Sequence, residues 1–467
     1  MANGHETAIL VSTWIHASLL AFTPFSNLHR AMVPLKHVLA FLVHLLFSAT
    51  NACHQLPTTL HIPVVHRDAV LSPHNRRSPL SRRFAADAER HTGLMTGSGG
   101  HLHSPVMSGL PFESGEYFAS IGVGTPSTSA LLVIDTGSDL IWLQCKPCRH
   151  CYNQMNPLYD PKRSSTYSQI PCSSPQCHKL QGCDNSTGAC GYTMVYGDGS
   201  ASSGNLATDR LVFSNETSVH NVTIGCGHDN EGLFDSSAGL LGVGRGNPSF
   251  ASQVAPSYGH YFAYCLGNRT SNARSVSSYL VFGRTPELPS TAFTPLLSNP
   301  RRPNLYYVNM AGFSVGGERV TGFFNSSLSL DPASGRGDVV VDSGTSISRF
   351  PRDAYEALRD AFDARAAAGG MRRLSGDISV FDACYDMRGV AITNVPQIVL
   401  HFAGGADMAL PPENYFIPED SRNGKCYCLA LEATDDGLSV LGNVQQQGFR
   451  VVFDVEKERV GFAPRGC

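Results

Sequence analysis

Two short stretches decide how this chain of 467 residues is interpreted: LLVIDTGS at Leu131–Ser138 and VVVDSGT at Val339–Thr345. Each is an apolar run that ends in an Asp, followed by a small hydroxyl residue, a Gly and a second hydroxyl residue. One Asp-x-Gly turn is unremarkable, because Asp and Gly both favour tight turns. The same order twice in one chain predicts two similar lobes, each with an Asp at the end of a strand.

The repeat continues beyond these turns. An apolar pair followed by Gly ends 107 residues after Asp135, at Gly242, and again 100 residues after Asp342, at Gly442. If a twofold axis relates the lobes, the two carboxylates meet on it and share one proton. The ionised Asp can then take a proton from a water, while the protonated Asp hydrogen-bonds a carbonyl. We therefore predict Asp135 and Asp342 as catalytic residues of a hydrolase that needs no cofactor and no metal.

The residues that follow each Asp have predicted supporting roles. The first hydroxyl can brace the two turns against each other, the Gly keeps each turn tight, and the second hydroxyl can donate to the outer carboxylate oxygen. The alternative is that they are ordinary turn residues. The six residues are Thr136, Gly137 and Ser138 in the first turn and Ser343, Gly344 and Thr345 in the second.

A hairpin is predicted where Gly191–Val195 runs into the turn sequence YGDGS at 196–200. With Tyr196 near its tip, this hairpin can fold over a cleft and exclude water. An exposed edge hairpin is the alternative. In either case we expect the Tyr196 side chain to be mostly exposed to solvent.

From residue 116 onward, short apolar runs alternate with Gly, Pro, Asn and Asp, which is typical of antiparallel β structure. One helix is predicted after Pro351, with Tyr355 and Phe362 on one face and a stop at Gly369-Gly370. The predicted class is mainly β, with two similar antiparallel lobes around a central cleft. The predicted strands are Tyr117–Val123, Ala130–Ile134, Leu211–Phe213, Val222–Ile224, Tyr279–Phe282, Tyr306–Met310, Val339–Val341, Ile398–Phe402 and Arg450–Val455.

The front end has the order of a secretory signal. A ten-residue apolar run, Val38–Phe47, follows Lys36 and precedes small residues that end at Ala52. Because it is too short to cross a bilayer, we predict a signal region at 1–52 and no stable membrane anchor. Met32 is the better start, which makes residues 1–31 an artefact of gene prediction. The expected location is the secretory pathway, leading to the extracellular space (the apoplast) or the vacuole.

Residues 53–105 contain six Arg and seven His, and few apolar residues that recur at any period. They are predicted to be a removable prosegment that covers an acidic cleft, with a disordered linker as the alternative. The predicted N-terminal lobe is 106–290 and the C-terminal lobe 291–467. Residues 1–104 hold 8 basic and 4 acidic residues, which leaves 27 basic and 34 acidic residues in the body. This mildly acidic body argues against nucleic acid as a partner, and we expect a monomer.

The chain has 14 cysteines, which predict disulfides in an exported protein. The spacing Cys145-x-x-Cys148-x-x-Cys151 is also compatible with zinc or an iron–sulfur cluster, the alternative reading. Removing the front end takes away Cys53 and leaves thirteen, so one thiol must stay free or pair between chains. The sequence Gly242–Gly246 is interpreted as a turn, because it lacks the spacing of a phosphate loop. Glycosylation is predicted at five sequons: Asn185, Asn215, Asn221, Asn268 and Asn325.

Together these motifs resemble the pepsin-type aspartic proteases, and more closely their plant nepenthesin-type branch. The resemblance covers residues 60–467 and adds Trp142, after the first motif, as a supporting residue. It implies a secreted aspartic endopeptidase, made as a zymogen, with an acid optimum and with proteins or peptides as substrates. It is carried by DTGS, DSGT, YGDGS, the cysteine-rich insert Cys145–Cys190, HRD at His66–Asp68, and CGHDNEGLF at Cys226–Phe234, which is similar to a subgroup that includes the guard-cell aspartic protease.

The resemblance also implies a pairing of the cysteines. In the last pair either Cys426 or Cys428 can reach Cys384, and the family pattern after Cys428 favours Cys428, which leaves Cys426 free. The implied pairs are Cys145–Cys148, Cys151–Cys226, Cys172–Cys190, Cys177–Cys183, Cys265–Cys467 and Cys384–Cys428.

A second class of function fits the same fold. Some plant relatives have lost catalysis and act as inhibitors or binding proteins of cell-wall hydrolases, typically after losing a motif Asp or the hairpin aromatic. This chain keeps both Asp residues and Tyr196, which favours the enzyme. A chloroplast relative is associated with DNA, but the body of this chain has no basic cluster.

Overall fold

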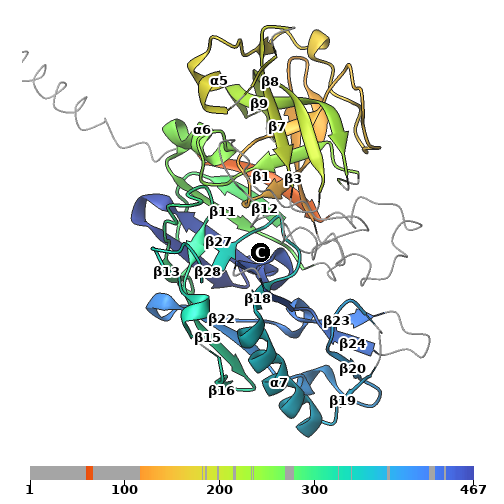
Figure 1. The fold of residues 1–467 in the computed structure, drawn as a ribbon, viewed down its shortest axis with the longest axis vertical. Coiled ribbons are helices and arrows are strands. Elements are labelled where there is room, and N and C mark those ends of the chain that lie inside the picture. Colours follow the sequence, from red (N-terminus) through yellow and green to blue (C-terminus); the bar gives the residue numbers. More distant parts are fainter. Residues whose placement is uncertain are drawn as a thin grey trace, which may run out of the picture. The chain divides into compact units, whose positions relative to one another are not determined.

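The computed structural model describes residues 59–66 and 116–467 (Figure 1). The gaps within the second range are 181, 185–186, 197–198, 214–216, 233, 235, 269–277, 324, 338, 376–378, 420–425 and 436–437. The predicted signal region, most of the predicted prosegment and the sequons at Asn185 and Asn215 therefore lie outside the described residues. In the described part of the chain, no helix is both long enough and apolar enough to cross a bilayer.

Among the described residues, the largest sheet has fifteen strands and draws on both halves of the sequence. Toward one end of its strand order, β11 and β12 lie next to β27 and β28 from the end of the chain, with β11 paired to β27. The proposed boundary between residues 290 and 291 stays a prediction. The fifteen strands are β1 (Leu60–His66), β2 (Tyr117–Val123), β3 (Thr128–Asp135), β4 (Trp142–Gln144), β5 (Ser168–Gln169), β6 (Cys183–Asp184), β7 (Ala189–Val195), β8 (Ala201–Val212), β9 (Ser218–Glu231), β10 (Gly239–Gly242), β11 (Tyr261–Cys265), β12 (Ser278–Phe282), β13 (Ala292–Pro295), β27 (Phe449–Asp454) and β28 (Arg459–Pro464).

In the part of the chain that the structure describes, three smaller sheets are built from the second half of the sequence. The first consists of β14 (Tyr307–Val308), β17 (Val339–Val341), β26 (Ser439–Leu441), β18 (Arg349–Pro351) and β25 (Glu432–Thr434). The second consists of β16 (Glu318–Arg319), β15 (Met310–Val315), β21 (Ile398–Phe402) and β22 (Asp407–Ala409). The third consists of β19 (Arg372–Arg373), β20 (Cys384–Asp386), β24 (Cys426–Leu429) and β23 (Phe416–Glu419).

Four α-helices accompany the sheets in the described residues: α5 (Pro175–Leu180), α6 (Phe250–Tyr258), α7 (Arg352–Ala368) and α8 (Asn443–Gln446). The longest, α7, confirms the predicted helix. It begins directly after Pro351, buries Tyr355 and Phe362, and has Gly369 as its C-cap. Each predicted strand falls on an observed one, although 306–310 is divided between β14 and β15.

The two Asp-bearing strands are paired in a way that the antiparallel expectation missed. β3 runs parallel to β10, with Asp135 opposite Gly242, and β17 runs parallel to β26. The glycine of each repeat has a steric reason. A Cβ on Gly242 would lie 2.4 Å from the backbone of Asp139, and a Cβ on Gly442 would lie 2.6 Å from the carbonyl oxygen of Ser346. Each contact involves the residue four positions after an Asp of the repeat, so the Asp turn and the Gly pack as one unit.

The front end contributes a strand, which the sequence analysis did not expect. β1 lies between β12 and β2 in the large sheet and pairs antiparallel with both. Leu60, Ile62 and Val64 are buried in the main core. The expectation that few apolar residues recur at any period in residues 53–105 is therefore wrong for this segment: its apolar residues alternate at the period of a β-strand and line one face. The prosegment stays a prediction.

Candidate active site

The turn after β3 holds the carboxylate of Asp135 from two sides. Its Oδ1 accepts a hydrogen bond from the backbone N of Gly137 at 2.8 Å, and its Oδ2 accepts one from Oγ of Ser138 at 2.7 Å. The side chain has no exposed surface. A buried carboxylate that accepts two hydrogen bonds from its own turn has a fixed orientation, which is what the sequence pattern predicts.

The turn after β17 repeats this arrangement around Asp342. Its Oδ1 accepts a hydrogen bond from the backbone N of Gly344 at 2.8 Å, and its Oδ2 accepts one from Oγ1 of Thr345 at 2.6 Å. Asp342 is also fully buried. The predicted roles of the two glycines and of Ser138 and Thr345 therefore agree with the geometry of both turns.

The two turns are braced against each other by reciprocal hydrogen bonds. The backbone N of Thr136 donates to Oγ of Ser343 at 3.2 Å, and the backbone N of Ser343 donates to Oγ1 of Thr136 at 2.9 Å. Each hydroxyl then donates to a carbonyl oxygen of the opposite strand, Thr136 to Val341 and Ser343 to Ile134. These four hydrogen bonds join residues more than 200 positions apart. Ser343 supplies the same hydroxyl group that a Thr would supply.

The bracing brings the two carboxylates to one place. A Cβ on Gly137 would lie 2.8 Å from Oδ2 of Asp342, so the carboxylate of the second turn lies against the backbone of the first. The same Gly137 donates its N–H to Asp135. A larger residue at position 137 would collide with Asp342, which explains the Gly at that position. Two carboxylates in this arrangement are expected to share a proton.

Residues behind the turns complete the site, and the sequence analysis missed them. Tyr264 on β11 donates to Oε1 of Gln446, whose Nε2 donates to the carbonyl oxygens of Leu441, at 2.7 Å, and of Asp342, at 3.2 Å. Asn443 donates to the carbonyl oxygen of Ser343 at 3.0 Å. The run NVQQQ directly after the second apolar-apolar-Gly segment was the available signal, since buried amides need hydrogen-bond partners.

The predicted hairpin exists, but Tyr196 is not exposed. β7 and β8 pair antiparallel, and Tyr196 follows β7 with only 3% of its surface accessible. Its hydroxyl accepts a hydrogen bond from Nε1 of the fully buried Trp142. The Phe234 ring packs edge-on against Tyr196, at 5.2 Å between centroids, and against Trp142, at 4.9 Å. The expectation of a solvent-exposed side chain is therefore wrong, because aromatic residues distant in the sequence enclose it.

Asp139, four residues after Asp135, is a buried acid that the sequence analysis did not single out. Burial raises its pKa from 3.8 to about 7, although hydrogen bonds from the backbone of Gly246 and the side chain of Asn304 lower it. The Gly246 N–H lies 2.8 Å from Oδ1 of Asp139. Cβ atoms on Gly244 or Gly246 would lie within about 2.5 Å of the same carboxylate. The Gly-rich sequence 242–246 is thus a turn wrapped around Asp139. This agrees with the sequence-based interpretation of 242–246 as a turn and not a phosphate loop.

Asp139 should make the protein more stable in acid than at neutral pH. Between pH 3.8 and about 7 the folded chain keeps a proton that the unfolded chain has lost. This stabilising contribution is complete below that window and lost as the pH rises through it, up to about 4 kcal/mol. Asp139→Asn should flatten the pH dependence of the melting temperature. The comparison is best made in an Asp342→Asn background, which prevents self-digestion. Identical pH profiles of the melting temperature with and without Asp139→Asn would contradict this assignment.

The disulfides correct four of the six implied pairs. Cys265–Cys467 and Cys384–Cys428 are as expected, and Cys426 is the free cysteine among the described residues. Four of the implied pairs are wrong: Cys145–Cys148, Cys151–Cys226, Cys172–Cys190 and Cys177–Cys183. The structure instead joins Cys145–Cys226, Cys148–Cys151, Cys172–Cys183 and Cys177–Cys190.

Strand pairing explains the first correction. Cys145 follows β4, which runs parallel to β9, and its backbone N donates to the carbonyl oxygen of Gly227 at 2.8 Å. This places Cys145 next to Cys226 on β9. Cys148 and Cys151 pair with each other, so all three cysteines of the spacing that suggested a metal are held in disulfides. No cysteine of this segment is therefore left as a free thiolate that could bind a metal.

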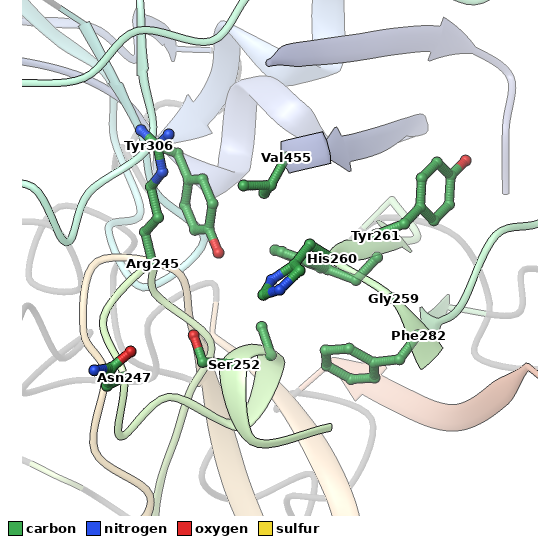
Figure 2. A pocket seen from close by; sticks show the side chains of 11 residues that line it. Arg245, Asn247, Ser252, Gly259, His260, Tyr261, Phe282, Tyr306 and Val455 are labelled. Carbon is green, nitrogen blue, oxygen red and sulfur yellow. The ribbon is translucent and has the colours of Figure 1, made fainter. Parts of the chain in front are cut away.

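A cavity of about 250 Å³ lies beside α6. Figure 2 shows Arg245 and Tyr306 on one side of it, facing His260 and Phe282. Arg245 is hydrogen-bonded within the protein: its Nη1 donates to the carbonyl oxygen of Leu297 at 2.8 Å. Neither Asp135 nor Asp342 lines this cavity.

Comparison with known proteins agrees with this geometry. The family described as Xylanase inhibitor N-terminal matches residues 117–284, and the one described as Xylanase inhibitor C-terminal matches 305–464. The chain is 49% identical over 370 residues to Aspartyl protease family protein 2 of Arabidopsis thaliana, covering 79% of this chain and 74% of that protein. This chain belongs to the plant aspartic protease family. Membership confirms the predicted resemblance.

Two further members of the plant aspartic protease family match the subgroups that the motifs indicated. Protein ASPARTIC PROTEASE IN GUARD CELL 2 of Arabidopsis thaliana is 37% identical over 90% of both chains. Aspartic proteinase nepenthesin-1 of Nepenthes gracilis is 36% identical over 81% of this chain and 83% of its own. The predicted similarity to nepenthesins and to the guard-cell subgroup is thus confirmed.

Solved structures support the pepsin-like, mainly β fold. The crystal structure titled edgp aligns with a TM-score of 0.62 at 22% identity, covering 79% of this chain and 96% of that one. Basic 7S globulin from soybean aligns with a TM-score of 0.60 at 19% identity, covering 77% and 95%. At these identities the likeness concerns the fold alone.

Proposed function

We propose that this plant aspartic protease homologue is a secreted endopeptidase that hydrolyses peptide bonds in proteins or peptides. The observation that carries the proposal is the pair of buried Asp turns, each oriented by its own Gly and hydroxyl and locked to the other through Thr136 and Ser343. Membership of the family makes a peptidase the expected activity. Asp135 and Asp342 are the proposed catalytic residues.

In the proposed mechanism the two carboxyls hold one proton between them. The ionised Asp takes a proton from a water that attacks the peptide carbonyl, while the protonated Asp donates a hydrogen bond to the carbonyl oxygen. The hydrogen bonds from the turns keep both carboxylates oriented, so no reorganisation is needed during the step. No covalent intermediate forms on the protein, and no metal takes part.

Two further parts of the proposal, secretion and synthesis as a zymogen, have support in the structure. Six disulfides among the described residues suit an oxidising compartment, in agreement with secretion to the apoplast or vacuole. Synthesis as a zymogen is supported by β1, because a segment of the proposed prosegment is built into the core sheet. Glycosylation stays a proposal, with Asn221 exposed and thus accessible.

The second candidate is a catalytically inactive homologue that binds cell-wall hydrolases. It is favoured by the match to families described as xylanase inhibitor. Both Asp residues, their hydroxyl partners and Tyr196 are in place, which an inactive protein would not need. The endopeptidase is therefore the function we propose.

A digestion experiment distinguishes the two functions. The purified full-length chain would be acidified and then incubated with a complex peptide mixture, followed by mass spectrometry of the new termini. We expect many internal cleavages under acidic conditions and few at neutral pH, because the shared proton of the carboxyl pair is lost as the pH rises. Absence of cleavage at every pH, with intact binding to a hydrolase, would favour the inactive homologue.

A further inference from the structure

Three sulfur atoms lie together in the third small sheet, far along the chain from the first Asp turn. They belong to Cys384, Cys426 and Cys428, and each sulfur lies within 4.8 Å of the other two. All three residues are buried. Cys384 and Cys428 form a disulfide, whereas Cys426 is a thiol. A thiol held this close to a disulfide is a candidate for exchange, in which a thiolate attacks a disulfide sulfur.

The strand register explains why the three meet. β20 and β24 are antiparallel, with Cys384 directly opposite Cys428 and Asp386 opposite Cys426. Residues two apart on a strand point to the same face, so Cys426 is the diagonal neighbour of Cys384. The three cysteines pack in one buried cluster together with Ile347, which comes five residues after Asp342.

We propose that these residues form a thiol–disulfide exchange site, at which the chain interconverts a Cys384–Cys428 and a Cys384–Cys426 disulfide. The thiolate of Cys426 attacks Sγ of Cys384. A Cys384–Cys426 bond forms as the Cys384–Cys428 bond breaks, and Cys428 leaves as a thiolate that takes up a proton. One disulfide and one thiol are present before and after, so the step needs no oxidant or reductant.

Cys384, rather than Cys428, is the sulfur under attack. Attack on Cys428 would join two residues of the same strand, whose Cα atoms are about 6.6 Å apart, close to the upper limit for a disulfide. A Cys384–Cys426 bond joins neighbouring strands, whose diagonal residues lie about 7–8 Å apart, so it also needs backbone movement. Unlike the separation within one strand, this distance can be closed by sliding one strand along the other. A two-residue slide of β24 along β20 would place Cys426 opposite Cys384 and keep every side chain on its own face.

The surroundings of Cys426 make the exchange sensitive to pH. Burial raises the pKa of its thiol, and the nearby carboxylates of Glu419, on β23, and Asp386, on β20, raise it further. Arg372 and Arg388 bind Asp386 and partly offset its charge. Because only the thiolate attacks, exchange should be suppressed in acid and should speed up about tenfold per pH unit while the pH stays below the thiol pKa.

The wild-type, full-length chain provides the first test. Samples would be incubated without reductant under acidic or mildly alkaline conditions, quenched in acid, unfolded and alkylated, and the labelled cysteines located by mass spectrometry. Among Cys384, Cys426 and Cys428, we expect label on Cys426 alone after acid incubation, and on both Cys426 and Cys428 after alkaline incubation; Cys53, outside this site, is scored separately. Label confined to Cys426 at every pH, or appearing on Cys384, would overturn the proposal.

Two matched Ser variants provide the second test. Cys428→Ser should form a Cys384–Cys426 disulfide and show no label at either position, whereas Cys426→Ser should keep Cys384–Cys428. Two free thiols in folded Cys428→Ser would overturn the proposal, and if that variant does not fold, the wild-type pH series decides. Both tests read sulfur pairing directly, so their outcome does not depend on whether the chain is a peptidase.

Discussion

Asp135→Asn and Asp342→Asn should each lower peptidase activity by at least about 10³-fold, the scale of a lost general acid or base. Asn has nearly the same shape, and its Oδ1 can still accept the backbone N–H that each turn supplies. The hydroxyl that donates to Oδ2 of each Asp can rotate to accept a hydrogen bond from the Asn amide instead. It cannot take a proton from water or share one with the opposite carboxyl. The measurement is the initial rate of peptide cleavage in acid by the processed wild type and by each variant.

The control for this pair is Asp360→Asn, which removes an exposed carboxylate on α7. It should leave the rate within about twofold of wild type, since exposed charges contribute little. The two active-site variants should also fold, which their disulfide pattern and thermal melting can verify. Retention of wild-type rates by either Asn variant would remove the basis for the proposed mechanism.

Tyr196→Ala should lower kcat/KM by about 10²-fold, because the hairpin, which we propose orders the substrate, would lose its anchor. It should also cost about 3 kcal/mol of folding free energy, since the ring is buried against Trp142 and Phe234. Tyr196→Phe keeps the ring and loses the hydrogen bond with Trp142, at about 1 kcal/mol. Steady-state kinetics and thermal melting of both variants would measure these effects.

A destabilised control separates the two effects of Tyr196→Ala. Leu358→Ala opens a cavity under α7 and should cost about 2 to 5 kcal/mol of stability, with kcat/KM unchanged well below the melting temperature. If Tyr196→Ala behaves like Leu358→Ala, with lower stability and normal kinetics, then Tyr196 is a core residue without a part in substrate ordering.

The local chemistry of the site was predictable from the sequence because each Asp is oriented by residues within three positions of it. Gly137, Ser138, Gly344 and Thr345 could be assigned from spacing alone. The bracing by Thr136 and Ser343 followed once the repeat predicted two similar lobes that face each other. These features depend on short-range geometry and on symmetry, both of which are visible in the sequence.

Features that depend on distant strand pairing were not predictable. The burial of Tyr196 is caused by Phe234, which comes from another part of the chain. Cys145 meets Cys226 because β4 and β9 are parallel neighbours, a relation that cysteine spacing does not contain. The raised pKa of Asp139 comes from burial under a turn a hundred residues later.

The β1 strand was not predicted for a different reason. Its alternation of Leu60, Ile62 and Val64 was present in the sequence, but the Arg and His content of residues 53–105 dominated the interpretation. A seven-residue strand needs few apolar side chains when it is inserted between two existing strands, because the backbone hydrogen bonds to both neighbours carry the pairing. Average composition over fifty residues cannot detect such a segment.

The central claim is that Asp135 and Asp342 act as one carboxyl pair, and digestion of a peptide mixture in acid with and without pepstatin tests it most directly. Pepstatin mimics the tetrahedral intermediate that water forms at such a pair. The account predicts that cleavage by the processed wild-type chain is abolished by pepstatin and unaffected by a chelator or by serine- and cysteine-directed reagents. Cleavage that persists in pepstatin and stops with a chelator would contradict it.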